Sequence, residues 1–392
     1  MNERISQCIT DNQGLFVQLR RDLHRIPETA FTETKTAAYV AARLQEWGYT
    51  TQEGVGQTGV VALLEGGAGH GPVLAVRADM DALAVTEQTG LPFTSEHPGR
   101  MHACGHDSHM AMALGAAYVL AQFRHALAGT VKFIFQPSEE QPTGAGAMIA
   151  DGVLTNPVPD GIVGLHNWPG LPVGQLALRS GPVTGSVDRF EITIAGRGGH
   201  GAKPHETVDP VVMASHCVLA LQAVVSRLND PVKPLVLTIG AIHGGEAFNV
   251  IPHEVCLTGT IRAADPAVQK LVPDQMQQVL NGVTAAYGGT AALAYQWGIP
   301  SVVNDAAFTQ RTEGYLRRWF PDDQVVELAE PSLVGEDYSL FLEAIPGTFF
   351  FLGTGAGDGF GLHHPKYSVP EEILSIGVKS FCAIVWEFFS QK

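Results

Sequence analysis

Short apolar segments bounded by Gly or Pro alternate with segments of helical spacing, and this alternation constrains the fold more than any other feature of the chain. Strands separated by helices are typical of a mainly parallel sheet that is covered by helices on both faces. The expected strands of the first half are GVVALLEG, PVLAVRAD, TVKFIFQ and GIVGLHN, and the expected helices include NQGLFVQLRRDLHR, TKTAAYVAARLQEWG and the segment that follows Ser108. The sequence therefore predicts an α/β fold.

A different order of elements begins near Gly185. The patterns from there to about Trp297 follow the order β-α-β-β-α-β, which is typical of a small antiparallel sheet with two helices on one face. The α/β pattern then returns and continues to the C-terminal end. We predict one α/β catalytic domain, residues 1–184 and 297–392, interrupted by an inserted α+β domain of residues 185–296.

Composition excludes several classes of partner. The net charge is −15, and no run of Lys or Arg is present, which argues against nucleic acid or an anionic membrane as partner. No apolar run reaches about 18 residues, and the polar start lacks the apolar core of a secretory signal. The five cysteines are scattered and odd in number, which suits a reducing compartment. We expect a cytoplasmic protein with no membrane or nucleic-acid partner.

The segment MHACGHDSHM carries the strongest chemical signal. It places Cys104 among several imidazole and carboxylate groups, directly before an Ala- and Met-rich helix, and the members of this cluster are His102, Cys104, His106, Asp107 and His109. A thiolate flanked by imidazoles is typical of a site for Zn²⁺ or a neighbouring transition ion, and not for Ca²⁺ or Mg²⁺.

Other reactive side chains come at the ends of predicted strands. They are Asp79 and Asp81 after PVLAVR, Glu139 and Glu140 after KFIFQ, His166 in GIVGLHN, and His363 and His364 after TFFFLGTG. Ligands of parallel α/β sheets gather at the carboxyl ends of the strands. We therefore expect these groups to meet the cysteine cluster at one edge of the sheet.

This set of groups suffices for two metal ions that share one bridging ligand. Such a pair polarises a carbonyl group and generates hydroxide. A further carboxylate must move the proton to the leaving nitrogen, and the adjacent Glu139 and Glu140 can divide metal binding and proton transfer between them. The chain has no H-E-x-x-H motif, which excludes the helix-borne zinc-protease arrangement. Zn²⁺, Mn²⁺, Co²⁺ and Ni²⁺ all stay open as the native ion.

Motifs along nearly the whole chain resemble the amidohydrolase branch of the metal-dependent aminoacylase and carboxypeptidase family, which includes hippurate hydrolases, N-acyl-amino-acid amidohydrolases and indole-acetyl-amino-acid hydrolases. These motifs are LHRIPE, VRADMDAL, MHACGHDSHMA, FQPSEE, GLHNWP, GRGGHGAKPH, FNVIP, GTIRA, GEDYSLF, FFLGTG and LHHP. The resemblance implies that the inserted domain serves as a lid or dimerisation domain, in a homodimer or a higher homo-oligomer.

The resemblance also implies roles for single residues of the catalytic domain. The implied ligands of the two metal ions are Cys104, His106, Glu140, His166 and His363, with Cys104 as the bridge. Glu139 is the implied general base and acid, and Asp81 supports the site from behind the ligands. Asp79, like His102, Asp107 and His109, is not expected to bind metal.

In the inserted domain, His200 resembles the histidine that polarises the scissile carbonyl, from its own or a partner subunit. Asn249 and Arg262 resemble groups that hold the carboxylate of the substrate. A planar Arg side chain suits that task. One departure from the family pattern is Gln141–Pro142 directly after the glutamate pair, where many relatives have Gly-Gly, and it weakens any inference on substrate preference.

The expected activity is metal-dependent hydrolysis of the amide bond between an acyl or aroyl group and an amino acid, releasing a carboxylic acid and a free amino acid. Three alternatives stay open. The chain could be a dipeptidase or carboxypeptidase of the same family. Cys104 and a histidine could form a nucleophilic dyad. The fold could also serve as a ligand-binding or scaffolding protein that has lost its chemistry.

Overall fold

The computed structural model describes residues 1–355 and 359–390. Contacts within the chain divide it into two compact units. The first unit comprises residues 1–181, 303–329 and 337–392, and the second comprises residues 182–302 and 330–336. The segment 185–296, expected as an insertion, lies within the second unit.

The first unit is built on an eight-stranded sheet with the order β1-β2-β4-β3-β5-β16-β6-β15. Its strands are β1 Thr50–Val55, β2 Gly59–Glu65, β3 Val73–Asp79, β4 Thr130–Gln136, β5 Gly161–Trp168, β6 Leu176–Leu178, β15 Val325–Glu327 and β16 Gly347–Gly353. The central strands β4, β3, β5 and β16 are parallel, whereas β1, β2 and β6 introduce antiparallel pairs. The mainly parallel sheet predicted from the sequence is confirmed, within a mixed sheet.

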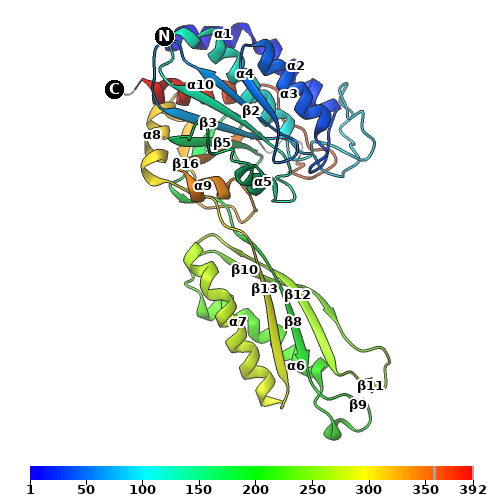
Figure 1. The fold of residues 1–392 in the computed structure, drawn as a ribbon. Coiled ribbons are helices and arrows are strands. Elements are labelled where there is room, and N and C mark those ends of the chain that lie inside the picture. Colours follow the sequence, from blue (N-terminus) through cyan, green and yellow to red (C-terminus); the bar gives the residue numbers. More distant parts are fainter. Residues whose placement is uncertain (356–358, 391–392) are drawn as a thin grey trace. The chain divides into compact units, whose positions relative to one another are not determined.

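Helices cover both faces of this sheet, with α1 to α4 and α10 on one face and the short α5 and α9 on the other (Figure 1). The helices are α1 Asn2–Asp11, α2 Gln13–Arg25, α3 Thr34–Glu46, α4 His106–Gln122, α5 Gly144–Ala150, α8 Ala306–Arg317, α9 Ser339–Ala344 and α10 Ile373–Phe389, with a 3-10 turn at Arg124–Ala126. Helix α4 packs against α2, α10 and β3. Because it is apolar and buried nearly all round, α4 rigidly holds the loop at its N-terminus.

The second unit has the predicted β-α-β-β-α-β order. Its antiparallel sheet has the strand order β10-β12-β8-β13 and carries α6 and α7 on one face (Figure 1). The elements are β8 Val187–Ala195, β9 Gly199–His200, α6 Pro210–Ala223, β10 Leu235–His243, β11 Val250–Ile251, β12 Glu254–Ala263, α7 Pro266–Ala286 and β13 Thr290–Ile299, with short helical turns at Pro204–Glu206 and Val224–Leu228. Two further short strands are β7 Gly181–Pro182 and β14 Val303–Asn304.

Alternation along the strands explains why α6 and α7 pack on one face of the second sheet. In β8, Phe190, Ile192 and Ile194 are buried against the helices, while Arg189 and Glu191 on the opposite face are exposed. The helix Pro210–Leu228 is long and apolar enough to cross a membrane by length and composition alone, and within the described residues it is the one helix of that kind. Its buried stripe belongs to the core of the second unit.

Candidate metal centre

The metal-capable side chains of the first unit gather at the carboxyl edge of its sheet. Cys104 and His106 stand at the start of α4, Glu140 follows β4, His166 lies near the end of β5, and His363 follows β16. The ligand atoms of Cys104, His106 and His166 all lie within 4.8 Å of one another. The ligand atoms of Cys104, Glu140 and His363 form a second group, also within 4.8 Å of one another. The Cys104 thiol therefore belongs to two potential metal positions.

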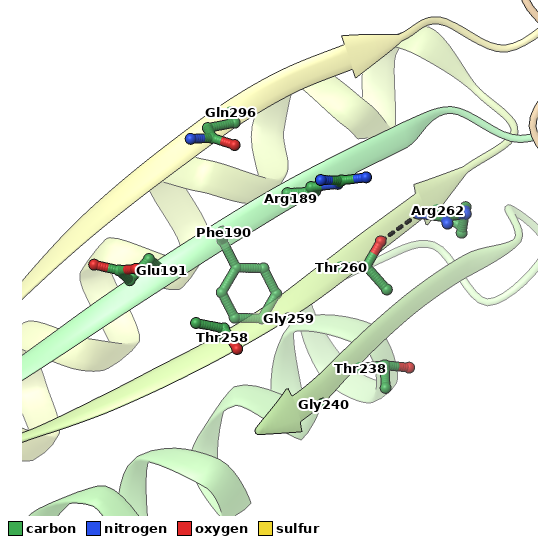
Figure 2. A pocket seen from close by; sticks show the side chains of 10 residues that line it. All are labelled: Arg189, Phe190, Glu191, Thr238, Gly240, Thr258, Gly259, Thr260, Arg262 and Gln296. Carbon is green, nitrogen blue, oxygen red and sulfur yellow. Dashed lines mark hydrogen bonds between the residues drawn. The ribbon is translucent and has the colours of Figure 1, made fainter. Parts of the chain in front are cut away.

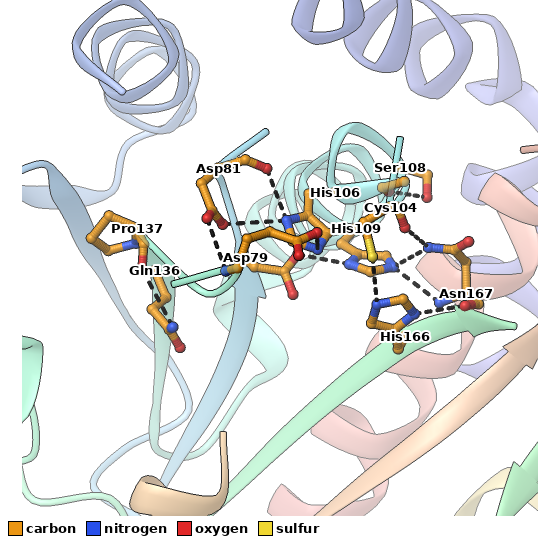
Figure 3. A network of polar contacts seen from close by, with 12 residues as sticks. Asp79, Asp81, Cys104, His106, Ser108, His109, Gln136, Pro137, His166 and Asn167 are labelled. Carbon is orange, nitrogen blue, oxygen red and sulfur yellow. Dashed lines mark hydrogen bonds and ion pairs between the residues drawn. The ribbon is translucent and has the colours of Figure 1, made fainter. Parts of the chain in front are cut away.

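The two buried histidines present Nε2 to this site because their Nδ1 atoms are held by carbonyl oxygens. His106 Nδ1 donates to the backbone oxygen of Asp81 at 2.9 Å, and His166 Nδ1 donates to the backbone oxygen of Asn167 at 2.6 Å (Figure 3). His166 Nε2 lies 3.5 Å from Cys104 Sγ. A carbonyl behind the ring fixes its orientation, as is usual for metal-binding histidines.

Several buried polar atoms at the site have no hydrogen-bond partner in the part of the chain that the structure describes. They are His106 Nε2, Glu140 Oε1 and Asp81 Oδ1. Buried polar atoms are normally paired, and an unpaired one calls for an explanation. Thiolate, imidazole and carboxylate donors are the set that Zn²⁺ and its neighbours prefer. The residues present therefore fit a pair of divalent transition ions.

The electrostatic setting of the site also favours a cation. Burial and the carboxylates of Glu140 and Glu139 raise the pKa of the Cys104 thiol well above its ordinary value. Although burial opposes the charged ring, Asp79 and its neighbouring carboxylates raise the pKa of His106 to about 10. A metal ion at these atoms displaces both protons.

The same setting disfavours Cys104 as a nucleophile. A nucleophilic thiol depends on a lowered pKa and a histidine that accepts its proton. Here burial and nearby carboxylates raise the pKa of Cys104, while burial and the neighbouring His109 lower the pKa of His166 well below its ordinary value. Neither partner is in the charged form that a thiolate–imidazolium pair requires.

His109 and Asp79 lie beside the centre, but their polar atoms are already engaged. His109 Nδ1 is 2.7 Å from Asp79 Oδ1, and its Nε2 accepts from the backbone nitrogen of Asn167 at 3.0 Å. Arg77 donates to Asp79 Oδ2 at 2.8 Å. Burial opposes the anion, yet His106, His109 and Arg77 together hold the pKa of Asp79 well below its ordinary value. These two groups therefore support the site without an atom to spare for metal.

Asp107 points away from the centre and anchors the start of α4. Its Oδ2 accepts from Arg20 Nε at 3.0 Å and lies 2.9 Å from His24 Nδ1. Although burial opposes ionisation, these two cationic groups lower the pKa of Asp107. The second nitrogen of His24 contacts Glu87 at 3.2 Å.

Asp81 connects the glutamate loop to His106. Its Oδ2 accepts from the backbone nitrogen of Glu140 at 3.0 Å, and its backbone oxygen accepts from His106. The carboxylate of Glu139 lies within 4.8 Å of the ligand atoms of both His106 and Glu140. Glu139 thus lies beside the ligand positions, while Gln141, where the loop departs from the family pattern, is exposed.

Gly105 shapes the loop between Cys104 and α4. Its φ of +86° lies in the left-handed region, and a Cβ there would lie 2.5 Å from Nδ2 of Asn167. That same Nδ2 donates to the backbone oxygen of Cys104 at 2.8 Å. Glycine is therefore required both for the turn and for the close approach that holds the thiol loop.

His363 closes the site from the loop after β16 and is the most exposed of the predicted ligands. Its backbone nitrogen donates to Ala103 at 2.8 Å, which ties this loop to the thiol loop. Its Nε2 lies 3.4 Å from Glu140 Oε1, and the Glu140 carboxylate raises the pKa of His363. Its side chain is 55% exposed, so substrate can reach the centre on this side.

In the second unit, His200 and Asn249 lie on adjoining short segments. His200 pairs with Val250 across β9 and β11, and both His200 and Asn249 are exposed. The Nδ1 atom of His200 accepts from the backbone nitrogen of Ala202 at 3.0 Å. The neutral ring then carries its proton on Nε2, which makes that nitrogen a hydrogen-bond donor.

Arg262 lies on β12, on the open face of the four-stranded sheet of the second unit, in a cavity of about 490 Å³ (Figure 2). It donates to the hydroxyl of Thr260 and to the backbone oxygen of Ile261. Arg189 lines the same cavity from β8, directly across from Thr260. Burial lowers the pKa of Arg262, and the charge of Arg189 acts in the same direction, although Asp188 opposes it. The arrangement leaves a cationic pair on this face.

Comparison with known proteins agrees with the family resemblance of the motifs. A profile of the peptidase family M20/M25/M40 matches residues 75–387. The chain belongs to this family. It is therefore a hydrolase that acts on amide C–N bonds.

Relatives within the M20/M25/M40 family differ in the activities for which they are named. The N-acetyl-L-cysteine deacetylase of Bacillus subtilis is 40% identical over 91% of this chain and 83% of that protein. The thermostable carboxypeptidase 1 of Saccharolobus solfataricus is 37% identical over 98% of both. The structure of YXEP from Bacillus subtilis, a dinuclear metal-binding peptidase of family M20, matches with a TM-score of 0.85 and 38% identity, over 96% of this chain and 98% of that one.

Three supporting residues of this M20 chain were not foreseen from the sequence. Asn167 joins Cys104 to His109, Arg77 holds Asp79, and Glu33 accepts from the glutamate loop. Asn167 stands directly after His166 in the GLHN motif, which is the signal that could have revealed it. Arg77 stands two positions before Asp79 in the VRADMDAL motif, whereas Glu33 lies on a separate segment, where the sequence pattern gives no such signal.

Proposed function

We propose that this hydrolase cleaves the amide bond between an acyl or aroyl group and an amino acid, with two divalent metal ions as cofactor. The observation that carries the proposal is the pair of ligand groups that share Cys104. A bridging ligand with two further donors on each side is the arrangement that a dinuclear centre needs. YXEP, a dinuclear metal-binding peptidase, supports this number of ions.

In this proposal, His106 and His166 would hold one ion, Glu140 and His363 would hold the other, and Cys104 would serve as the ligand common to both. The bound ions would polarise the scissile carbonyl and lower the pKa of the attacking water. Asp81 keeps His106 and Glu140 in place. The division of the chain into a metallohydrolase domain, residues 1–184 and 297–392, and a lid or dimerisation domain, residues 185–296, belongs to the same proposal.

Glu139 moves the proton in the proposed reaction. Its carboxylate is next to the ligand atoms, yet it is not needed to complete either ligand group. It removes a proton from the attacking water and returns that proton to the leaving nitrogen, so that the amine departs neutral. The same residue serves as base and then as acid, and the products are a carboxylic acid and a free amino acid.

Residues of the second unit recognise the substrate in this proposal. His200 donates from Nε2 to the scissile carbonyl oxygen, either in its own subunit or in a partner. Arg262 and Asn249 hold the α-carboxylate of the amino-acid part; because they lie at opposite ends of the β10–β12 pair, the two groups come from different subunits in this proposal. The half-buried guanidinium supports this role, because a desolvated cation binds a carboxylate more strongly than an exposed one.

We infer that the protein is a homodimer or a higher homo-oligomer assembled through the second unit. Helix α6 exposes Val211, Val212 and Leu219, and the edge strand β10 exposes Val236 and Ile242. An apolar helix face beside an open strand edge favours a second copy of the same surface. We also propose a cytoplasmic location, since all five cysteines are free thiols.

A dipeptidase or carboxypeptidase activity is the second candidate. The carboxypeptidase of Saccharolobus solfataricus is nearly as similar to this chain as the cysteine deacetylase is. Both activities cleave an amide bond next to an amino acid with a free α-carboxylate. They differ in whether the carbonyl side of that bond is a simple acyl group or a second amino acid. A panel of acetyl- and benzoyl-amino acids beside unmodified dipeptides distinguishes the two.

The decisive test combines this panel with metal analysis of the same sample. We expect about two divalent ions per chain, turnover of N-acyl amino acids, loss of activity on chelation and recovery on adding Zn²⁺, Mn²⁺, Co²⁺ or Ni²⁺. Glu139→Gln should keep the metal content and lower kcat by at least about 100-fold. Full activity after complete metal removal, or near-normal turnover by the Gln variant, contradicts the proposed mechanism.

A further inference from the structure

The loop that carries Glu139 is held in an unusual backbone conformation. Ser138, directly before Glu139, has a φ of +51°, in the left-handed region that residues with a side chain rarely adopt. Ser138 is fully buried, and its backbone oxygen accepts from the nitrogens of Thr143 and Gly144. A conformation of this kind persists only where surrounding contacts maintain it.

Glu33 supplies one of these contacts from a distant segment. Its Oε1 accepts from the backbone nitrogen of Ser138 at 2.9 Å, and its Oε2 accepts from the hydroxyl of Thr58 at 2.6 Å. Glu33 is fully buried, directly before α3. Its two carboxylate oxygens therefore connect the turn between β1 and β2 to the loop that carries Glu139.

The second anchor of the loop is Asp81, which accepts from the nitrogen of Glu140. The backbone nitrogens on the two sides of Glu139 are thus both held by buried carboxylates, Glu33 on one side and Asp81 on the other. Burial, together with the nearby charge of Asp81, raises the pKa of Glu33, although hydrogen bonds from Thr58 and Ser138 act in the opposite direction. Burying a carboxyl group is costly unless its oxygens are hydrogen-bonded, and both oxygens of Glu33 accept such bonds, from Ser138 and from Thr58.

We propose that Glu33 is a positioning residue for the proposed proton transfer by Glu139, acting through the backbone of Ser138. The proposal rests on the assignment of Glu139 as general base. The Glu33 side chain fixes the left-handed turn and thereby the direction in which the Glu139 carboxylate leaves the loop. It does not touch the metal ligands, so its loss misplaces the base without removing a ligand.

The same segment offers a matched control in Glu28. This residue is also buried, and its carboxylate accepts from the nitrogens of Lys35 and Thr36 at the start of α3. Both glutamates thus stabilise the region around α3, but within the described contacts only Glu33 reaches the loop of Ser138. Replacement of Glu28 measures the purely structural cost of losing a buried carboxylate here.

The experiment compares Glu33→Ala, Glu33→Gln and Glu28→Ala as metal-loaded full-length enzymes, with N-acyl amino acids as substrates. For Glu33→Ala we expect kcat to fall by about 10- to 100-fold, as for a base displaced by about 1 Å, with KM within about threefold of wild type and unchanged metal content. Glu33→Gln should recover most of kcat, because its amide oxygen accepts from Ser138 and its amide nitrogen donates to Thr58. Glu28→Ala should lower Tm but leave kcat of the folded enzyme within about threefold.

Wild-type kcat in Glu33→Ala overturns the proposal, as does an equal loss of kcat in Glu28→Ala or a loss that follows the metal content. If Glu33→Ala does not fold, Glu33→Asp replaces it as the test, since Asp keeps the carboxylate but is too short to reach Ser138 in the same way. The kcat of Glu33→Asp should also fall, and a normal kcat overturns the proposal. The Glu139→Gln variant separates the two levels of inference. An active Glu139→Gln contradicts the proposed function, whereas an inactive one beside a fully active Glu33→Ala contradicts only the role of Glu33.

Discussion

The buried pair of His24 and Asp107 predicts a specific dependence of stability on pH. His24 is 1% exposed and contacts Asp107 at 2.9 Å and Glu87 at 3.2 Å. Burial opposes the charged ring, but the two carboxylates outweigh it and raise the pKa of His24 from 6.5 to about 9. The folded protein therefore binds this proton more tightly than the unfolded chain does.

The size of the effect follows from the shift. A change of one pKa unit corresponds to about 1.4 kcal/mol, so the His24 proton contributes up to about 3 kcal/mol to the free energy of unfolding. Because the pKa is raised on folding, this contribution is fully present below about pH 6.5 and is lost as the pH rises through about 9. His24→Gln keeps an amide donor for Asp107 but carries no titrating proton.

Urea unfolding of the metal-free wild type and His24→Gln between pH 6 and 10 tests this prediction. Metal-free protein is needed because metal binding itself releases protons and adds its own pH dependence. The other titrating groups, including His106, are common to both proteins, so the difference between the two curves isolates His24. We expect the wild type to lead by up to about 3 kcal/mol near pH 6 and the lead to shrink towards pH 10. A constant difference over this range would refute the assigned pKa and with it the charged pair beneath α4.

Two further predictions concern the thiol loop and the substrate site. Gly105→Ala should lower the free energy of unfolding by about 1–2 kcal/mol because of its left-handed backbone, and it should also displace Asn167 and weaken metal binding. The control Gly99→Ala, with a φ of +75° and open space around its Cβ, should show the loss of stability from backbone strain alone. Urea unfolding and metal titration measure both variants, and equal metal affinities would contradict the role of Gly105. Arg262→Lys should raise KM by about 10-fold with little change in kcat, since Lys lacks the planar guanidinium that binds a carboxylate through two hydrogen bonds. The control Arg189→Lys, on the neighbouring strand, should leave KM unchanged. Steady-state kinetics measure both variants, and equal effects on KM would mean that the substrate carboxylate binds elsewhere.

Local patterns of the sequence were sufficient for the architecture and for the residue types of the site. Apolar runs followed by Asp79, Glu139 and His166 identified three strand ends, because strand periodicity and bounding Gly or Pro residues act over a few positions. The parallel order of the central strands then brings these ends to one edge. The antiparallel β2 and the segment 330–336 in the second unit were not predictable, since each depends on pairing between segments far apart in the chain.

The sequence by itself determined which chemical groups could come together at the site. Only the tertiary structure decided which of their atoms remain free of hydrogen bonds and so available to a metal ion. His106 and His109 stand three positions apart in one motif and look alike as ligands. Packing gives His106 a carbonyl behind its ring and leaves its Nε2 without a hydrogen-bond partner among the described residues, whereas Asp79 and Asn167 occupy both nitrogens of His109. The difference arises because hydrogen bonds between distant segments, unlike strand and helix periodicity, form only when the chain has folded.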